Sequence, residues 1–134
     1  ISLPLIPISI GFISYQELYK IGEQIAKTAE ELNYNIAVIA SGDLSHRLKK
    51  GAPAGYNPDA HLFDEKLIKY FKEKDFNSIL NFDPELVEKA GECGLRPIIT
   101  MLGSIGGMDV EVNVNSYEGP FGVGYGTVFI EPES

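Results

Sequence analysis

Apolar residues recur along this chain with two different periods, one typical of helices and one typical of strands. From Ser14 to Asn33 they return every three or four positions, which predicts an amphipathic helix with one buried face. The buried positions of this helix are Leu18, Ile21, Ile25, Ala29 and Leu32. Ser14 is followed three residues later by Glu17, the spacing of a capping box, so we expect the helix to begin directly after Ser14.

Two short apolar runs flank this helix, at residues 5–10 and 35–40. Runs of this length without helical period predict buried strands. A strand, a helix and a second strand in this order form a β-α-β unit, whose strands are normally parallel and joined by a right-handed crossover.

The rest of the chain predicts further helices and then two more strands. Helix-start signals occur at Asn57-Pro58, at Asp75 and at Asp83-Pro84, and the helix that begins just before Pro97 includes the apolar residues 98–102. Residues 110–114 alternate between valine and polar side chains, which predicts a half-buried strand, and residues 126–130 predict a last one. We therefore predict a single α/β unit over residues 1–134. A mixed central sheet has helices on both faces, and the β-α-β unit is followed by helices and two further strands.

Composition narrows the class of protein. The formal net charge of −8 argues against nucleic acid and against anionic membrane surfaces as partners, because both select basic patches. No segment reaches the length of a membrane span. The single cysteine, Cys93, excludes an internal disulfide and favours a reducing compartment, so we expect a cytoplasmic protein.

The loop after the second predicted strand carries the first candidate chemistry. Asp43, Ser45 and His46 lie within four residues, beyond the carboxyl end of that strand, where sites of open α/β sheets collect. Imidazole is a common acid/base group near neutral pH, which makes His46 a candidate for proton transfer. The alternative is a capped turn in which His46 only hydrogen-bonds a backbone carbonyl. His61, the other histidine, is expected to be a solvated residue of the first turn of its helix.

A second candidate pair, Glu92 and Cys93, precedes the helix at Pro97. Free amides and the helix dipole at an amino terminus favour a carboxylate or a thiolate there. The alternative is a capping glutamate beside a buried, inert cysteine. A hydrolase that uses Ser41 or Ser45 with His46 is disfavoured, because no nucleophile-elbow pattern is present.

Three motifs in order carry a family resemblance: residues 41–46 (SGDLSH), 91–97 (GECGLRP) and 116–126 (SYEGPFGVGYG). Together they resemble the LigB-like family, which comprises catalytic subunits of class III extradiol ring-cleavage dioxygenases and their Memo-type and AmmeMemoRadiSam relatives. The resemblance covers nearly the whole chain. It implies a non-haem iron(II) held by two histidines and a glutamate, a further histidine as acid/base, and a small catechol-like aromatic substrate.

Carried onto this sequence, the resemblance gives His46 the acid/base role and Glu92 the metal-ligand role. Asp43, Ser45, Cys93 and Tyr117 are the further pocket residues it suggests. Memo-type proteins carry a cysteine close to the position of Cys93, so the alignment leaves Glu92 and Cys93 open as alternatives.

No residue here matches the family's two metal-binding histidines, which lie in its amino-terminal half. The resemblance therefore implies that residues 1–134 form the carboxyl-terminal half of a LigB-like domain and that a missing amino-terminal half supplies those ligands. We expect the isolated chain to bind iron(II), zinc or another divalent metal weakly or not at all, and to be inactive in ring cleavage. The functional prediction is a fragment of an extradiol dioxygenase. The alternative is a Memo-like binding or scaffold module with the same fold.

Overall fold

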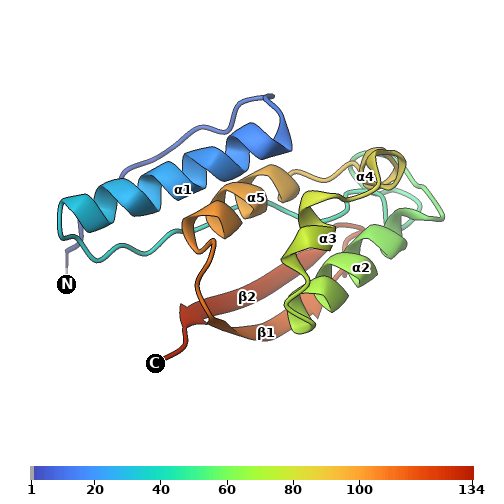
Figure 1. Cartoon of the computed structure of the whole chain (residues 1–134). Helices are drawn as coiled ribbons and strands as arrows, with labels where there is room; N and C mark the ends of the chain where they lie inside the picture. The colour runs from blue at the N-terminus through green and yellow to red at the C-terminus, as the bar shows by residue number, and fades with distance from the viewer. Residues whose placement is uncertain (1) are drawn as a thin grey trace.

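A computed structural model describes residues 2–134, in which five helices accompany one antiparallel hairpin (Figure 1). The helices are α1 (Tyr15–Glu31), α2 (Ala60–Lys72), α3 (Phe76–Leu80), α4 (Pro84–Ala90) and α5 (Leu95–Ser104). The strands are β1 (Val110–Glu118) and β2 (Tyr125–Pro132). This content confirms the α/β class. Within residues 2–134 no helix is both long and apolar enough to span a membrane.

The local start and stop signals act largely as predicted. Ser14 caps α1 with a complete capping box, Asp75 caps α3, and Asp83 caps α4 with Pro84 in the first turn. Gly91 ends α4 in the left-handed conformation, at φ 61°. The start of α2 differs from the prediction, because Asn57 forms a turn with the amide of Asp59 and the helix begins only at Ala60.

The predicted β-α-β unit is not formed within residues 2–134: its helix is present, but its two strands are not. Residues 5–10 and 35–40 lie outside every helix and strand, and the one sheet formed within residues 2–134 is the β1–β2 hairpin. In Figure 1 both segments run in the direction opposite to α1 and are drawn without strand arrows. A strand exists only through hydrogen bonds to a neighbour, and the described residues offer these segments none. The sheet formed within residues 2–134 is antiparallel, so the expected mixed sheet is not found there.

The helices pack on one face of the hairpin. Alternate residues of the strands, including Val112, Val114, Val128 and Ile130, pack against a core to which all five helices contribute. The opposite face, with Glu111, Asn113 and Phe129, is exposed, so the expected helices on both faces are not found among the described residues. The fully buried side chains of the core include Leu18, Phe63, Leu67, Ile79, Leu95, Ile99 and Leu102.

A β-bulge in β1 changes which side chains face the helices. Val114 pairs with Val128, but the next pair is Ser116 with Thr127, so β1 holds one extra residue at this point. An extra residue reverses the alternation of the strand beyond it. Tyr117 consequently points to the side of the core, where an unbroken strand would have placed Ser116.

Candidate functional site

The loop that carries His46 is bound on both sides by backbone hydrogen bonds. On one side the amide of Leu44 donates to the carbonyl of Gly124 at 2.9 Å, and the amide of Gly124 donates to the carbonyl of Ser45 at 2.8 Å. On the other side the amide of His46 donates to the carbonyl of Ala90, the last residue of α4, at 2.9 Å. The loop is therefore fixed between the glycine-rich turn of the hairpin and the end of α4.

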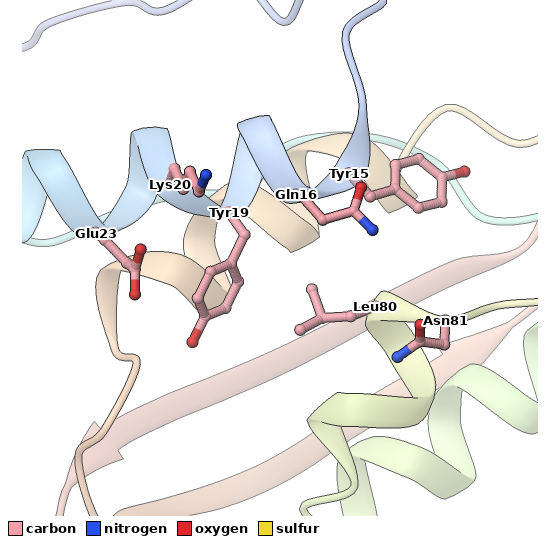
Figure 2. A pocket seen from close by; sticks show the side chains of 7 residues that line it. All are labelled: Tyr15, Gln16, Tyr19, Lys20, Glu23, Leu80 and Asn81. Carbon is pink, nitrogen blue, oxygen red and sulfur yellow. The ribbon is translucent and has the colours of Figure 1, made fainter.

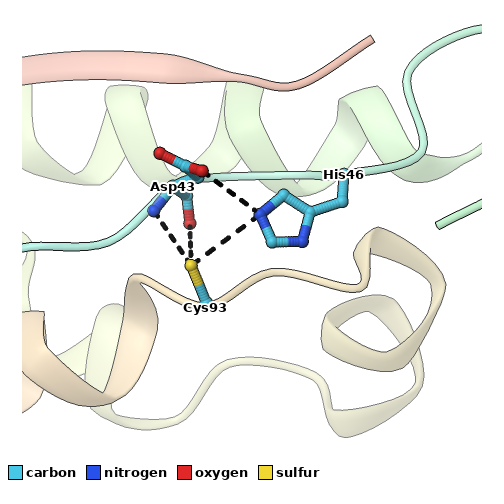
Figure 3. A group of neighbouring side chains, drawn as sticks. All are labelled: Asp43, His46 and Cys93. Atoms are coloured by element: carbon cyan, nitrogen blue, oxygen red, sulfur yellow. Dashed lines mark hydrogen bonds and ion pairs between the residues drawn. The ribbon is translucent and has the colours of Figure 1, made fainter. Parts of the chain in front are cut away.

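Asp43, His46 and Cys93 form one cluster, although the cysteine lies nearly fifty residues from the others (Figure 3). His46 Nε2 lies 3.7 Å from Cys93 Sγ and 3.6 Å from Asp43 Oδ2. The amide of Asp43 donates to the same sulfur at 3.1 Å. The structure thus brings together the two motifs that the sequence singled out separately.

Two glycines permit this approach. A Cβ atom on Gly42 would lie 2.6 Å from the Cα of Gly94, and one on Gly94 would lie 2.9 Å from the carbonyl oxygen of Asp43. Both distances are too short for any other residue type. The glycines that flank the candidate residues in both motifs therefore let the two backbones meet.

Glu92 stays outside the close cluster. Its Oε2 accepts a hydrogen bond from the amide of Leu95 at 2.6 Å, so the side chain caps the start of α5. Burial raises the pKa of the Glu92 carboxyl, and hydrogen bonds from the amides of Leu95 and Gly94 offset part of this rise. The capping role is therefore observed, and metal binding by Glu92 stays a prediction.

Ser45 and Tyr117 lie near the site, but other groups engage their hydroxyls. The Ser45 hydroxyl is buried, donates to the carbonyl of Ala90 at 3.0 Å and accepts from the amide of Arg47 at 3.2 Å. The Tyr117 hydroxyl donates to Asp64 Oδ2 at 2.5 Å. A Ser45 hydroxyl held in this way is not free to act as a nucleophile, which disfavours the hydrolase hypothesis further.

Sequence reasoning missed Asp64. It is fully buried on α2, and its Oδ1 accepts from the amide of Ser45 at 2.8 Å. A signal was present, since Asp64 falls on the buried face of α2 between Phe63 and Leu67. A carboxylate in an apolar stripe needs partners, and here they come from the His46 loop and β1.

The donor set of the cluster fits one divalent cation. One oxygen, one nitrogen and one sulfur ligand atom lie within 4.8 Å of one another. Metal–ligand bonds are about 2.0–2.3 Å long, so atoms separated by this distance can bind the same ion. The two metal-binding histidines implied by the resemblance are not found among residues 2–134, because His46 belongs to this cluster and His61 is exposed in the first turn of α2. The His46 side chain is 23% exposed and that of Asp43 48%, so the cluster is open to solvent.

A separate groove lies between α1 and α3, with a volume of about 330 Å³ (Figure 2). Its walls are Tyr15, Gln16, Tyr19, Lys20, Glu23, Leu80 and Asn81. None of the cluster residues lines it. At one end of the groove the Tyr15 ring lies 5.3 Å from the guanidinium of Arg96, whose Nη1 also donates to the carbonyl of Ile13 at 2.6 Å.

Comparison with known proteins identifies the family of this chain. Residues 1–129 match the family described as the catalytic LigB subunit of aromatic ring-opening dioxygenase. Protein CA_C1420 of Clostridium acetobutylicum is 42% identical over 95% of this chain and 27% of its own length. The 3,4-dihydroxyphenylacetate 2,3-dioxygenase of Escherichia coli is 34% identical over 65% of this chain and 34% of its own length.

A third relative, the MEMO1 family protein MJ0403 of Methanocaldococcus jannaschii, is 33% identical over 73% of this chain and 31% of its own length. The chain thus spans only about a third of the length of these curated relatives. The relatives include a dioxygenase and MEMO1 family proteins, and the family match extends over residues 1–129. The chain therefore belongs to the LigB family.

Proposed function

We propose that this chain carries the proton-transfer side of a LigB-type active site that acts on a catechol-like aromatic substrate. His46 is the acid/base group in this proposal. The observation that supports it is the placement of the imidazole, which is partly exposed and packed against Asp43 and Cys93 on a loop fixed from both sides. A fixed, accessible imidazole is what proton transfer to or from a substrate hydroxyl requires.

The metal belongs to the same proposal. Glu92, together with two histidines from a polypeptide outside this chain, would hold iron(II), which supplies the binding positions for catecholate and dioxygen when bound. Within this chain Glu92 directly precedes Cys93 of the cluster, and burial raises the pKa of its carboxyl. In this proposal residues 1–134 form the carboxyl-terminal half of a LigB-like domain, and the rest of that domain supplies the two histidines.

A second candidate is a Memo-like binding module without ring-cleavage activity. Two observations favour it: Cys93 occupies the cluster, and Glu92 is engaged by the amide of Leu95. In that case Asp43, His46 and Cys93 bind the cation themselves. Thiolate ligands favour zinc or copper(I) over a hard ion such as magnesium.

Cobalt(II) titration of the purified chain separates the two candidates. If the cluster binds the ion, a thiolate-to-cobalt charge-transfer band appears, and Cys93→Ser removes it while Glu92→Gln leaves it. If the dioxygenase proposal holds, the isolated chain binds cobalt weakly without that band. Joined to the remaining part of a LigB relative, it binds iron(II) in a way that Glu92→Gln abolishes.

Oxygen consumption with catechol tests the catalytic claim directly. We expect none from the isolated chain supplied with iron(II), because it offers too few ligands to hold substrate and dioxygen on one ion. The joined protein should consume oxygen, and His46→Gln should lower its rate by about 10²–10⁴-fold, the usual contribution of a general acid/base. Full activity of His46→Gln would refute the proposed role.

A further inference from the structure

The most unusual buried group of the molecule is the Asp64 carboxylate. Asp64 is 0% exposed, and it is the only acidic side chain among the buried polar residues of the described chain. Burial raises the pKa of this carboxyl, whereas hydrogen bonds from Tyr117 and Ser45 lower it. A carboxylate in such a place costs stability unless its partners are well placed, so the partners identify what it does.

Each oxygen of the Asp64 carboxylate accepts a hydrogen bond from a different part of the fold. Oδ1 accepts from the amide of Ser45, the residue directly before His46, at 2.8 Å. Oδ2 accepts from the hydroxyl of Tyr117 on β1 at 2.5 Å. The bulge after Val114 is what turns Tyr117 toward Asp64. A local irregularity of the hairpin thus serves a contact to the His46 loop.

The hairpin turn leaves room for the same carboxylate. A Cβ atom on Gly124 would lie 2.0 Å from Asp64 Oδ2, so only glycine fits there. Gly124 also exchanges backbone hydrogen bonds with Leu44 and Ser45. Helix α2, the hairpin and the His46 loop therefore meet at one buried charge.

We propose that Asp64 is a positioning residue for the candidate site, with Tyr117 holding its carboxylate in place. The proposal rests on the proposed function only in taking His46 as the acting group. Hydrogen bonds to an ionised acceptor are roughly twice as strong as neutral ones. The charge on Asp64 therefore fixes the Ser45 amide, and with it the place of the His46 ring beside Cys93.

Two volume-conserving variants test this. Asp64→Asn removes the charge and keeps an acceptor for Ser45. Tyr117→Phe removes the phenol hydrogen bond, after which the buried carboxyl binds a proton more readily and becomes a weaker acceptor. Tyr125→Phe on β2 is the matched control. In each variant, hydrogen exchange at the Ser45 amide is compared with that at the Ile99 amide in α5, and the nuclear Overhauser signal between the His46 ring and Cys93 is recorded.

We expect Asp64→Asn and Tyr117→Phe each to accelerate Ser45 exchange about tenfold relative to Ile99 and to weaken the His46–Cys93 signal. The double variant should exceed either single one only slightly, because both remove the same charge-assisted bond. Tyr125→Phe should change neither. Additive effects, an equal acceleration at Ile99, or an unchanged His46–Cys93 signal would overturn the proposal.

These measurements need neither metal nor substrate. If they come out as expected while the cobalt and oxygen experiments fail, the proposed function falls and the positioning role stands. If the joined protein cleaves catechol but Asp64→Asn and Tyr117→Phe leave Ser45 exchange unchanged, the positioning role falls and the proposed function stands.

Discussion

At the scale of single residues, Glu92 connects the stability of the fold to the proposed metal site. Burial raises the pKa of its carboxyl above the ordinary value, so folding favours the protonated form. A carboxyl with a raised pKa contributes most to stability at acid pH, and that contribution is lost as the pH rises through the folded-state pKa. At neutral pH the charged side chain therefore costs part of the stability that its hydrogen bond to Leu95 provides.

We predict that Glu92→Gln, measured without metal, is at least as stable as the wild type at pH 7, with a gain of up to about 1 kcal/mol. The neutral amide keeps an acceptor for the Leu95 amide and removes the buried charge. The difference from the wild type should shrink as the pH is lowered toward 4. Urea unfolding followed by circular dichroism between pH 4 and 8 measures this, with Glu111→Gln on the exposed face of the hairpin as control. A loss of stability at pH 7 that persists at pH 4 would show that the pKa argument is wrong.

The sequence predicted a residue's role correctly where neighbours in the chain determine that role, and it failed where residues distant in the chain determine it. Ser14 and Gly91 were placed correctly because caps depend on neighbours in the chain. Asp64 was missed because its partners, Ser45 and Tyr117, lie 19 and 53 residues away. The sequence offered only its position in an apolar stripe, which does not name those partners.

At the scale of elements, helices α1 and α5 pack in very close contact. A Cβ atom on Gly22 of α1 would lie 1.9 Å from the carbonyl oxygen of Thr100. One on Gly103 of α5 would lie 2.0 Å from the carbonyl oxygen of Tyr19. The two backbones touch where both helices carry glycine, as small residues at a helix crossing allow. Because α5 begins two residues after Cys93, this contact also fixes the helix that follows the cluster.

We predict that Gly22→Ala lowers the free energy of unfolding by about 1–3 kcal/mol, because the added methyl group must push the helices apart. Alanine's better helix propensity, worth about 1 kcal/mol, offsets only part of this loss. Thermal or urea unfolding measures the effect. Gly11→Ala is the matched control, since a Cβ there would meet nothing within 4 Å. Equal stability of Gly22→Ala and the wild type would mean that the helices are packed less closely than described.

Elements were also the scale at which the sequence misled. The apolar runs at residues 5–10 and 35–40 have strand composition, and composition does not reveal whether a neighbouring strand is available. The strands predicted at residues 110–114 and 126–130 are present as parts of β1 and β2, because these two segments pair with each other. The two pairs of segments differ in whether a partner strand is present, and a local sequence pattern does not show this.

At the scale of the whole molecule, the unpaired segments leave a large apolar surface. Leu5, Ile6 and Ile39 are each 82% exposed, and Phe12 is 96% exposed. Exposed apolar side chains on extended backbone without a sheet partner are sites of association. Under the proposed function, the rest of a LigB-type domain covers this surface and pairs with these segments, which would complete the metal site and the sheet together.

We predict that the isolated chain self-associates through these segments. Sedimentation velocity at increasing concentration should show species larger than a monomer, and the double variant Ile6→Lys/Ile39→Lys should shift the chain toward the monomer, because a lysine on such an edge opposes pairing. Met108→Lys is the control, since Met108 is also exposed, at 50%, but lies in the turn before β1. Joining the chain to the remaining part of a relative should suppress association without any substitution. A wild-type chain that stays monomeric at high concentration would contradict the idea that residues 5–10 and 35–40 await a partner, and with it the structural basis for placing half of the metal site outside this chain.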